Sequence, residues 1–206
     1  MEKVDFKKTL KELYLPSNKG FVMVDVPEMQ FVMIDGEGSP EKAAYTDAVQ
    51  WLFSVIYPVK FISKKRMEKD FVAPPLEGLW WADDINDFIV GNKDKWKWRT
   101  MIVLPDWVGL DIYEEAVEKA SKKLGKRPES LRVERFHEGK CVQIMHIGPY
   151  SAEGPTLQRM HEDYIPANGL TETGYHHEIY LNDPRRTAPE KLKTVLRQPV
   201  QKLSAS

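Results

Sequence analysis

Pro75-Leu76-Glu77-Gly78-Leu79-Trp80-Trp81 is the stretch from which the fold is predicted, because it has a partner near the other end of the chain, His177-Glu178-Ile179-Tyr180-Leu181. Each stretch places a glutamate at the start of a short apolar run, with aromatic side chains directly after it. Apolar runs of this length are typical of β-strands. A carboxylate among aromatic faces suits an aromatic or cationic small molecule. The two stretches therefore indicate a pair of strands that carry a small-molecule site.

The surroundings of the two stretches repeat as well, which predicts a chain built from two similar halves. Each half begins with two extended runs that resemble a hairpin, continues with an amphipathic helix and ends with two strands. The offset between the halves shrinks along the chain, and the basic connection after Pro58 is the natural place for the insertion that this requires. The matched residues are Val32 with Val142, Ile34 with Ile144 and Gly38 with Gly148 at an offset of 110, and Glu77 with Glu178 at an offset of 101.

Hydrophobic periodicity and turn residues place the other elements. Ser39 and Pro40 are expected to start the first helix and Pro58 to end it, since proline has no amide hydrogen for the preceding turn. The basic stretch 60–69 is then a solvated connection. The predicted hairpins are 21–26 with 30–35 and 131–136 with 140–147, and the predicted helices are 39–56, 111–124 and one around Leu157, Met160 and Tyr164. The predicted strands are 96–104, 177–182, 192–200 and, within 71–83, one that follows Pro74-Pro75 and carries Trp80 and Trp81.

These elements predict an α+β protein with antiparallel sheets. A half with one helix cannot cover both faces of its sheet, so we expect the halves to join side by side, with the helices on one side and a ligand groove on the other face or at the seam. Residues 1–20 are expected to form an N-terminal arm or short helix. Residues 21–206 are expected to form a single domain of two repeats, about 21–105 and 131–200, joined by the helix near 111–124.

Composition excludes several classes of protein. The 206 residues are 42% hydrophobic, enough for a sizeable core, and 30 basic residues balance 31 acidic ones, so the basic excess of a nucleic-acid-binding protein is missing. The first residues are charged, and no run has the length of a membrane span. Cys141, the only cysteine, lies in an apolar run and is interpreted as a buried small hydrophobe. We therefore expect a cytoplasmic protein with no nucleic-acid or membrane partner.

Strand geometry decides which of the marked side chains can act together. Residues two apart share a face, so Glu178 and Tyr180 point the same way, as do Glu77 and Trp81, while Trp80 points to the opposite face. If the repeat holds, Glu77 and Glu178 converge on one groove from two sides. The alternatives are a solvated charge at a strand end for Glu178 and a turn cap for Glu77. A regular strand cannot turn both tryptophans into the groove.

Several standard sites are not indicated. His176 and His177 are adjacent and face opposite ways on a strand, so they cannot ligate one metal together, and the other histidines lack ligand spacing. Gly36-Glu37-Gly38 lacks the remaining glycine and lysine of a phosphate loop, and no nucleophile elbow occurs. We therefore expect neither a metal site nor a cofactor.

Four motifs together give the chain a resemblance to the GyrI-like small-molecule-binding family, from about Phe21 to Val200. They are Met33 to Pro40, Pro75 to Trp81, His146 to Tyr150 and His177 to Leu181, and each would be weak by itself. The resemblance implies a tandem repeat of two βαββ units, SH2-like in topology, with pseudo-two-fold symmetry and a central ligand groove. It also implies that Glu178 stands where family members fused to helix-turn-helix modules use a glutamate to sense multidrug cations.

The resemblance further implies a choice of functions. Stand-alone members bind toxic small molecules or, in the cyclopropanoid cyclohydrolase subfamily, hydrolyse cyclopropane-bearing DNA alkylators of the yatakemycin type in an aromatic cage, and the Glu-Gly-Leu-Trp-Trp motif is associated with that subfamily. Hydrolysis of such xenobiotics for cellular protection is the first hypothesis, with Glu178 and Tyr180 catalytic. The alternative is non-catalytic sequestration of aromatic or cationic molecules, and a module that binds a protein partner is a third hypothesis. The expected ligand-binding residues are Trp80, Trp81, Glu77, Tyr45 and Tyr150.

Overall fold

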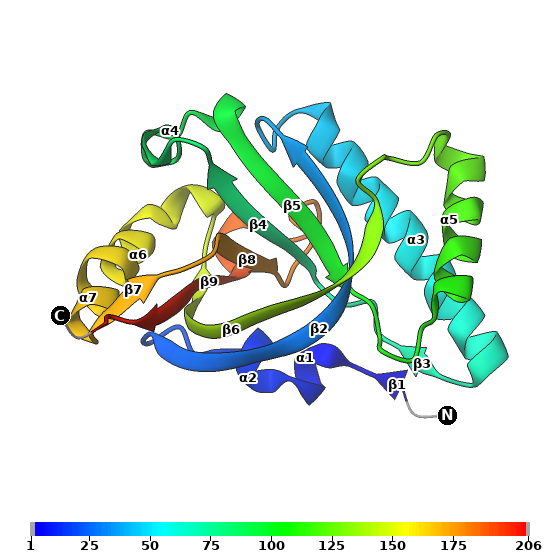
Figure 1. The fold of residues 1–206 in the computed structure, drawn as a ribbon, viewed down its shortest axis with the longest axis horizontal. Coiled ribbons are helices and arrows are strands. Elements are labelled where there is room, and N and C mark those ends of the chain that lie inside the picture. Colours follow the sequence, from blue (N-terminus) through cyan, green and yellow to red (C-terminus); the bar gives the residue numbers. More distant parts are fainter. Residues whose placement is uncertain (1–2, 205–206) are drawn as a thin grey trace. The chain divides into compact units, whose positions relative to one another are not determined.

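The computed structural model describes residues 3–204 and divides the chain into two compact units, each discontinuous in sequence (Figure 1). Unit 1 comprises Met1–Thr9 and Met29–Phe136, and unit 2 comprises Leu10–Glu28 and His137–Ser206. Two long strands, β2 (Val22–Glu37) and β6 (Arg132–Ile147), pass from one unit to the other. The predicted arm is divided too, since α1 (Phe6–Thr9) belongs to unit 1 and α2 (Lys11–Tyr14) to unit 2.

Unit 1 contains three antiparallel strands and two long helices. The central strand β5 (Trp96–Val103) lies between β2 and β4 (Leu76–Ala82). α3 (Ala43–Met67) and α5 (Leu110–Leu124) pack side by side, cyan and green in Figure 1. The short elements are β1 (Lys3–Val4), paired in parallel with β3 (Asp70–Phe71), α4 (Ile85–Ile89) and the 3-10 turn η1 (Lys93–Lys95).

Alternation along the strands separates the two faces of the unit 1 sheet. Val32, Trp80 and Trp98 share one face and belong to the same buried cluster as Leu52 and Val55 of α3. Burial of this apolar surface against the helix is the main stabilising contribution to the unit. No helix in the part of the chain from 3 to 204 is long and apolar enough to cross a membrane.

Unit 2 has the same strand order as unit 1. Its central strand β9 (Lys193–Lys202) lies between β6 and β8 (His176–Tyr180), and the short strand β7 (Leu170–Glu172) also pairs with β9. Between β6 and β7 the chain forms the 3-10 turn η2 (Tyr150–Ala152) and then a helical segment of α6 (Gly154–Gln158), the π-helical η3 (Arg159–Tyr164) and α7 (Ile165–Ala167); the 3-10 turn η4 (Pro189–Lys191) precedes β9. Met160 and Ile165 of this helical segment pack on one face of the sheet, against Val142, Ile144, Leu196 and Val200.

Each unit therefore consists of a long strand, a helix and two further strands, with the last strand in the middle, and the predicted α+β fold with antiparallel strands is confirmed. The pseudo-two-fold relation and the groove stay predictions. α3 has 25 residues and includes most of the basic stretch after Pro58, whereas the helical segment of unit 2 runs only from 154 to 167. The additional residues of the first half thus lie in its helix.

Both predicted hairpins are wrong, because each pair of extended runs is one strand of 16 residues. Pro27-Glu28-Met29 has no residue suited to the left-handed positions of a tight turn, and the φ of proline is compatible with an extended chain. His137-Glu138-Gly139 does contain a glycine, with φ 74°, but Glu138 is paired there with Arg197 and His177 inside unit 2. A turn at this point would have left the carboxylate in solvent.

The prediction that the first helix ends at Pro58 is also wrong. α3 begins at Ala43 and continues through Pro58 to Met67, so the basic stretch predicted as a solvated connection is its C-terminal part. The apolar periodicity continues beyond the proline with Val59 and Ile62, both buried. Packing of these side chains outweighs the cost of a proline inside a helix, about 3 kcal/mol.

Candidate functional site

β8 sorts its polar side chains onto the two faces of the unit 2 sheet. Glu178 pairs with Leu196, a residue of the face that the helical segment covers, so His176, Glu178 and Tyr180 all lie on that face. His177 lies on the opposite face. The alternation of the strand thus brings a carboxylate, an imidazole and a phenol together beside the helical segment.

Glu178 accepts hydrogen bonds from two residues of its own strand. Tyr180 Oη donates to Glu178 Oε2 over 2.7 Å, and His176 Nε2 donates to Glu178 Oε1 over 2.9 Å. Burial alone would raise the pKa of Glu178, but the bonds from His176 and Tyr180 prevail and hold that pKa below its ordinary value. Glu178 is therefore a carboxylate at neutral pH. With its side chain only 15% exposed, the alternative of a solvated charge at a strand end is excluded.

Glu153 lies beside this carboxylate and is not predicted from the sequence. It follows η2, which leads the chain from β6 into α6, and it is 6% exposed. Burial and the neighbouring charge of Glu178 raise the pKa of Glu153 to about 10, so its carboxyl group is protonated at neutral pH and shares a hydrogen bond with Glu178. The pair is a carboxylic acid beside a carboxylate, an arrangement suited to acid–base chemistry.

The sequence carries no signal for Glu153. It directly precedes α6, and glutamate is common at the start of a helix because it interacts favourably with the helix dipole. The position therefore reads as an ordinary helix terminus. Only the fold of unit 2 brings it to Glu178.

Two tyrosines predicted from the sequence flank the carboxyl pair. The rings of Tyr150 and Tyr180 meet edge to face, with centroids 5.8 Å apart. Burial of the hydroxyl and the charges of Glu178 and Glu153 raise the pKa of Tyr150 to about 12, so it stays a hydrogen-bond donor at neutral pH. Tyr150 is 40% exposed, and this side of the site is accessible to solvent. We call Glu153, Glu178, His176, Tyr150 and Tyr180 the glutamate cluster.

The opposite face of β8 carries a buried ionic network. Glu138 Oε2 lies 2.7 Å from His177 Nδ1, and Arg197 Nη1 donates to Glu138 Oε1 over 3.1 Å. Burial would raise the pKa of Glu138, but His177 and Arg197 hold it at about 2. Arg197 also donates to Gln143 Oε1 over 2.9 Å and to the carbonyl of Leu13 over 2.7 Å. The network therefore ties α2 to the sheet of unit 2.

Unit 1 gathers aromatic rings on the helix-covered face of its sheet. The Tyr45 ring lies 5.3 Å from that of Trp80 and 5.2 Å from that of Trp98 between centroids. The ring of Trp80 lies 6.0 Å from that of Trp96, and the tilted ring of Phe88 lies 4.9 Å from that of Trp96, between centroids. The structure thus brings together two predicted ligand-binding residues, Tyr45 and Trp80, within the buried cluster of unit 1.

Glu77 and Trp81 point to the other face of the unit 1 sheet, as strand alternation predicts. In the register with β5, Glu77 pairs with Met101 and Trp81 with Lys97. Glu77 is fully buried within β4, so the alternative of a turn cap is excluded. Trp80 and Trp81 therefore lie on opposite faces.

The predicted match between Glu77 and Glu178 is wrong by one residue. Glu178 corresponds instead to Gly78, and Glu77 corresponds to His177, because the matched residues Ile34 and Ile144 fix the register. A slip of one residue moves a side chain to the other face of a sheet. In unit 1, Thr100 pairs with Ile34 on one side and with Gly78 on the other. In unit 2, Leu196 pairs with Ile144 on one side and with Glu178 on the other.

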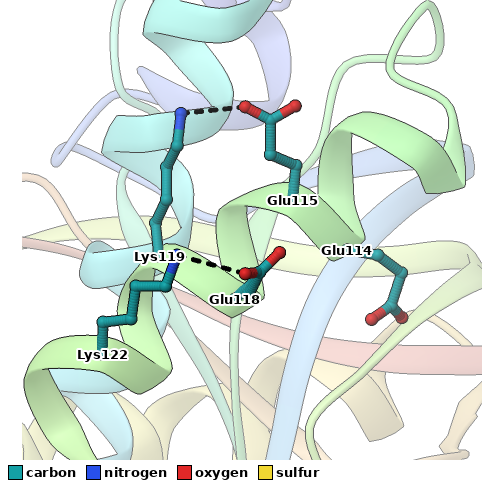
Figure 2. A pocket seen from close by; sticks show the side chains of 5 residues that line it. All are labelled: Glu114, Glu115, Glu118, Lys119 and Lys122. Carbon is teal, nitrogen blue, oxygen red and sulfur yellow. Dashed lines mark ion pairs between the residues drawn. The ribbon is translucent and has the colours of Figure 1, made fainter.

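A concave surface on α5 carries two ion pairs between residues of the helix (Figure 2). Lys119 pairs with Glu115 over 2.9 Å, and Lys122 with Glu118 over 3.1 Å. Exposed pairs one helical turn apart contribute about 0.3–0.5 kcal/mol each. With Glu114 these residues line the pocket, and they include neither an aromatic ring nor a buried acid. The α5 surface therefore lacks the groups that make the glutamate cluster chemically distinctive.

Comparison with solved structures finds close likenesses from Listeria innocua. A structure described as an uncharacterized conserved protein is 43% identical and covers 97% of this chain and 100% of its own, with a TM-score of 0.86. A second, described as a hydrolase, is 42% identical with the same coverage and a TM-score of 0.83. The EcmrR C-terminal domain, at 13% identity and a TM-score of 0.55, covers 89% of this chain and 98% of its own, and shares the fold alone.

The search of curated proteins finds no match to this chain. The family described as the GyrI-like small molecule binding domain matches residues 21–201, which is most of the sequence. The match includes every residue of the glutamate cluster and of the aromatic group of unit 1. The chain therefore belongs to the GyrI-like small-molecule-binding family.

Proposed function

We propose that this protein is a hydrolase that opens the cyclopropane ring of flat aromatic alkylating xenobiotics with water. The observation that carries the proposal is the contact between the ionised Glu178 and the protonated Glu153. Two solved structures that are 42% and 41% identical to this chain are described as hydrolases, which supports the reaction class. The resemblance to the cyclopropanoid cyclohydrolases supports the substrate class.

The cluster supplies the groups that the reaction needs. Glu178 takes a proton from water as the water oxygen bonds to the cyclopropane carbon. The carbon–carbon bond of the ring breaks at the same time, and its electron pair passes through the conjugated system to the carbonyl oxygen, which becomes a phenol after protonation. The Tyr150 hydroxyl donates the hydrogen bond that stabilises charge on that oxygen. General-base assistance of this kind is worth about 10² to 10⁴ in rate.

The aromatic residues are proposed to hold the ring system. Tyr150 and Tyr180 present their rings beside the carboxyl pair of unit 2. Tyr45, Trp80, Trp81 and Glu77 of unit 1 stay proposed ligand-binding residues. Substitution of a contacting tryptophan by alanine should weaken binding of a flat aromatic ligand by about 1–2 kcal/mol, and normal binding by both the Trp80→Ala and the Trp81→Ala proteins would remove these residues from the site.

The decisive experiment is incubation of the protein with a yatakemycin-type compound. We expect the ring-opened, hydrated product in many-fold excess over protein. The Glu178→Gln protein should form this product about 10² to 10⁴ times more slowly, because an amide cannot take the proton, while its affinity for the uncharged ligand changes little. Measurement of product by mass spectrometry and of binding by tryptophan fluorescence separates the two effects. Equal turnover by the variant would remove Glu178 from the chemistry.

Non-catalytic sequestration is the second candidate, favoured by the ionised Glu178, which is a counter-charge for a cationic ligand. In that case the compound would be recovered unchanged, in amounts no greater than the protein present. Glu178→Gln would then weaken binding of a cationic aromatic ligand and leave that of a neutral one unaltered. The same two assays therefore decide between the candidates.

A further inference from the structure

Thr194 lies on the same face of the unit 2 sheet as the glutamate cluster. It is in β9, directly opposite Tyr180 of β8 on one side and His146 of β6 on the other. Directly opposed residues of an antiparallel pair have Cβ atoms about 4.5–5.5 Å apart, and diagonal neighbours about 7–8 Å. Glu178 is such a diagonal neighbour of Thr194, because it pairs with Leu196.

The hydroxyl of Thr194 has no hydrogen-bond partner among residues 3–204, although the residue is 1% exposed. The polar atoms next to it are engaged in other bonds. Tyr180 Oη donates to Glu178 over 2.7 Å, and His146 Nε2 donates to the carbonyl of Pro149 over 3.0 Å. A buried hydroxyl without a hydrogen-bond partner costs about 1–3 kcal/mol of stability. A bound molecule that accepts a hydrogen bond from Thr194 would remove this cost.

A buried atom of the glutamate cluster also lacks a hydrogen-bond partner among the described residues. Glu153 Oε1 has no partner in the described part of the chain, and Glu153 is 6% exposed. Because the Glu153 carboxyl is protonated and shares its hydrogen with Glu178, Oε1 is the carbonyl oxygen of a neutral acid and acts as an acceptor. The site thus holds a hydroxyl that can donate and a carbonyl oxygen that can accept, both close to an ionised carboxylate.

These three groups match the hydrogen-bonding capacity of one water molecule. A buried water makes about three hydrogen bonds. The Thr194 hydroxyl can donate to the water oxygen, while Glu153 Oε1 and Glu178 each accept one of its hydrogens. One lone pair of the water then stays free to attack the substrate. The water hydrogen that is bonded to Glu178 is the one that this carboxylate removes.

We propose that Thr194 and Glu153 Oε1 hold the attacking water against Glu178, an inference that rests on the proposed hydrolysis. Thr194 is thereby a water-binding residue, not a ligand-binding one. Its hydroxyl makes water the preferred nucleophile over larger ones.

The matched variants are Thr194→Val, which keeps the shape and loses the hydroxyl, and Thr194→Ser, which keeps the hydroxyl. We expect kcat to fall about tenfold or more in the valine variant, the equivalent of one hydrogen bond, with unchanged affinity for the aromatic compound and near-normal kcat in the serine variant. In water containing methanol, the ratio of methyl ether to hydrated product should rise for Thr194→Val only. An unchanged ratio would mean that Thr194 acts through the fold, and would overturn the proposal.

A crystal structure of the ligand-free protein gives a test that needs no substrate. We expect an ordered water within hydrogen-bond distance of both Thr194 Oγ1 and Glu153 Oε1, and its loss in Thr194→Val. If no common water contacts the two atoms, the proposal is wrong. A wild-type protein that gives no hydrated product would contradict the proposed function itself, whereas normal turnover by Thr194→Val would contradict only the role of Thr194.

Discussion

Two glutamates of unit 2 take opposite protonation states because of what surrounds them. Glu178 accepts hydrogen bonds from His176 and Tyr180 and stays ionised at neutral pH. Glu153, buried beside that charge, has a pKa of about 10 and stays protonated. Two adjacent carboxyl groups that titrate far apart are an established sign of acid–base work. The acid–base chemistry proposed for this site depends on the contact between the two residues.

Glu153→Gln is expected to stabilise the protein at neutral pH. A carboxyl whose pKa is raised on folding contributes full stability below its unfolded pKa of about 4.5, and this contribution falls as pH rises toward the folded value of about 10. The neutral amide avoids that loss. We expect a gain on the order of 1–3 kcal/mol at pH 7 that vanishes below pH 4.5, measured by urea denaturation at several pH values. The exposed Glu190→Gln is the control, and a destabilised Glu153→Gln protein at pH 7 would contradict the assignment.

Glu138→Gln is expected to act in the opposite direction. The depressed pKa of Glu138, about 2, contributes stability above the unfolded value of 4.5 that is lost as pH falls toward 2. The amide leaves Arg197 buried without its counter-charge, which costs about 3–5 kcal/mol. Denaturant titration of the Glu138→Gln protein should therefore show a large decrease in the free energy of unfolding at pH 7, and a smaller decrease in acid. Glu134→Gln, which removes a partly exposed partner of Arg132, should cost under about 1 kcal/mol; equal losses in both would refute the network.

Among the elements, α3 shows how tertiary packing overrides a local rule. Pro58 stands inside a helix of 25 residues. Because the proline removes a backbone hydrogen bond, Pro58→Ala should raise the free energy of unfolding by about 1–3 kcal/mol, measured as an increase in Tm. Pro184→Ala, in an exposed loop, is the control. A lower Tm for Pro58→Ala would show that the ring of Pro58 stabilises α3 by its own packing.

The elements also show what sequence patterns could predict. β4, β5, β8, β9 and α5 lie where alternation and helical periodicity place them, within a few residues. The second hairpin and the end of α3 are mispredicted for one reason, since a proline or a polar residue predicts a break from the sequence, whereas burial in the fold decides the outcome. Glu138 shows this most clearly, because a charged residue between two apolar runs reads as a turn until Arg197 is known to face it.

The candidate site was predictable to the extent that it lies on one strand. Glu178 and Tyr180 share a face by alternation alone, and their hydrogen bond of 2.7 Å confirms that part of the prediction. Glu153 comes from another element, and its role depends on a contact that no local pattern carries. The match of Glu77 to Glu178 failed because an offset counted along the sequence cannot resolve a single-residue slip between strands.

For the molecule as a whole, the division into units does not follow the order of the sequence. Unit 2 takes Leu10–Glu28 as well as His137–Ser206. The amide of Gln143 donates to the carbonyl of Glu12, and Arg197 donates to that of Leu13. A fragment of residues 137–206 should therefore show no cooperative thermal transition, and a peptide of residues 10–28 should restore one. Circular dichroism checks both, and cooperative unfolding of the fragment alone would show that residues 10–28 are dispensable.

The long strand β2 has a consequence for synthesis on the ribosome. Its first residues, Val22–Glu28, belong to unit 2, whose remaining residues start only at His137. During translation the nascent chain must therefore keep residues 10–28 uncommitted while Met29–Phe136, the bulk of unit 1, emerges and folds. The glutamate cluster, assembled from η2, Glu153 and β8, can form only after β8 has left the exit tunnel.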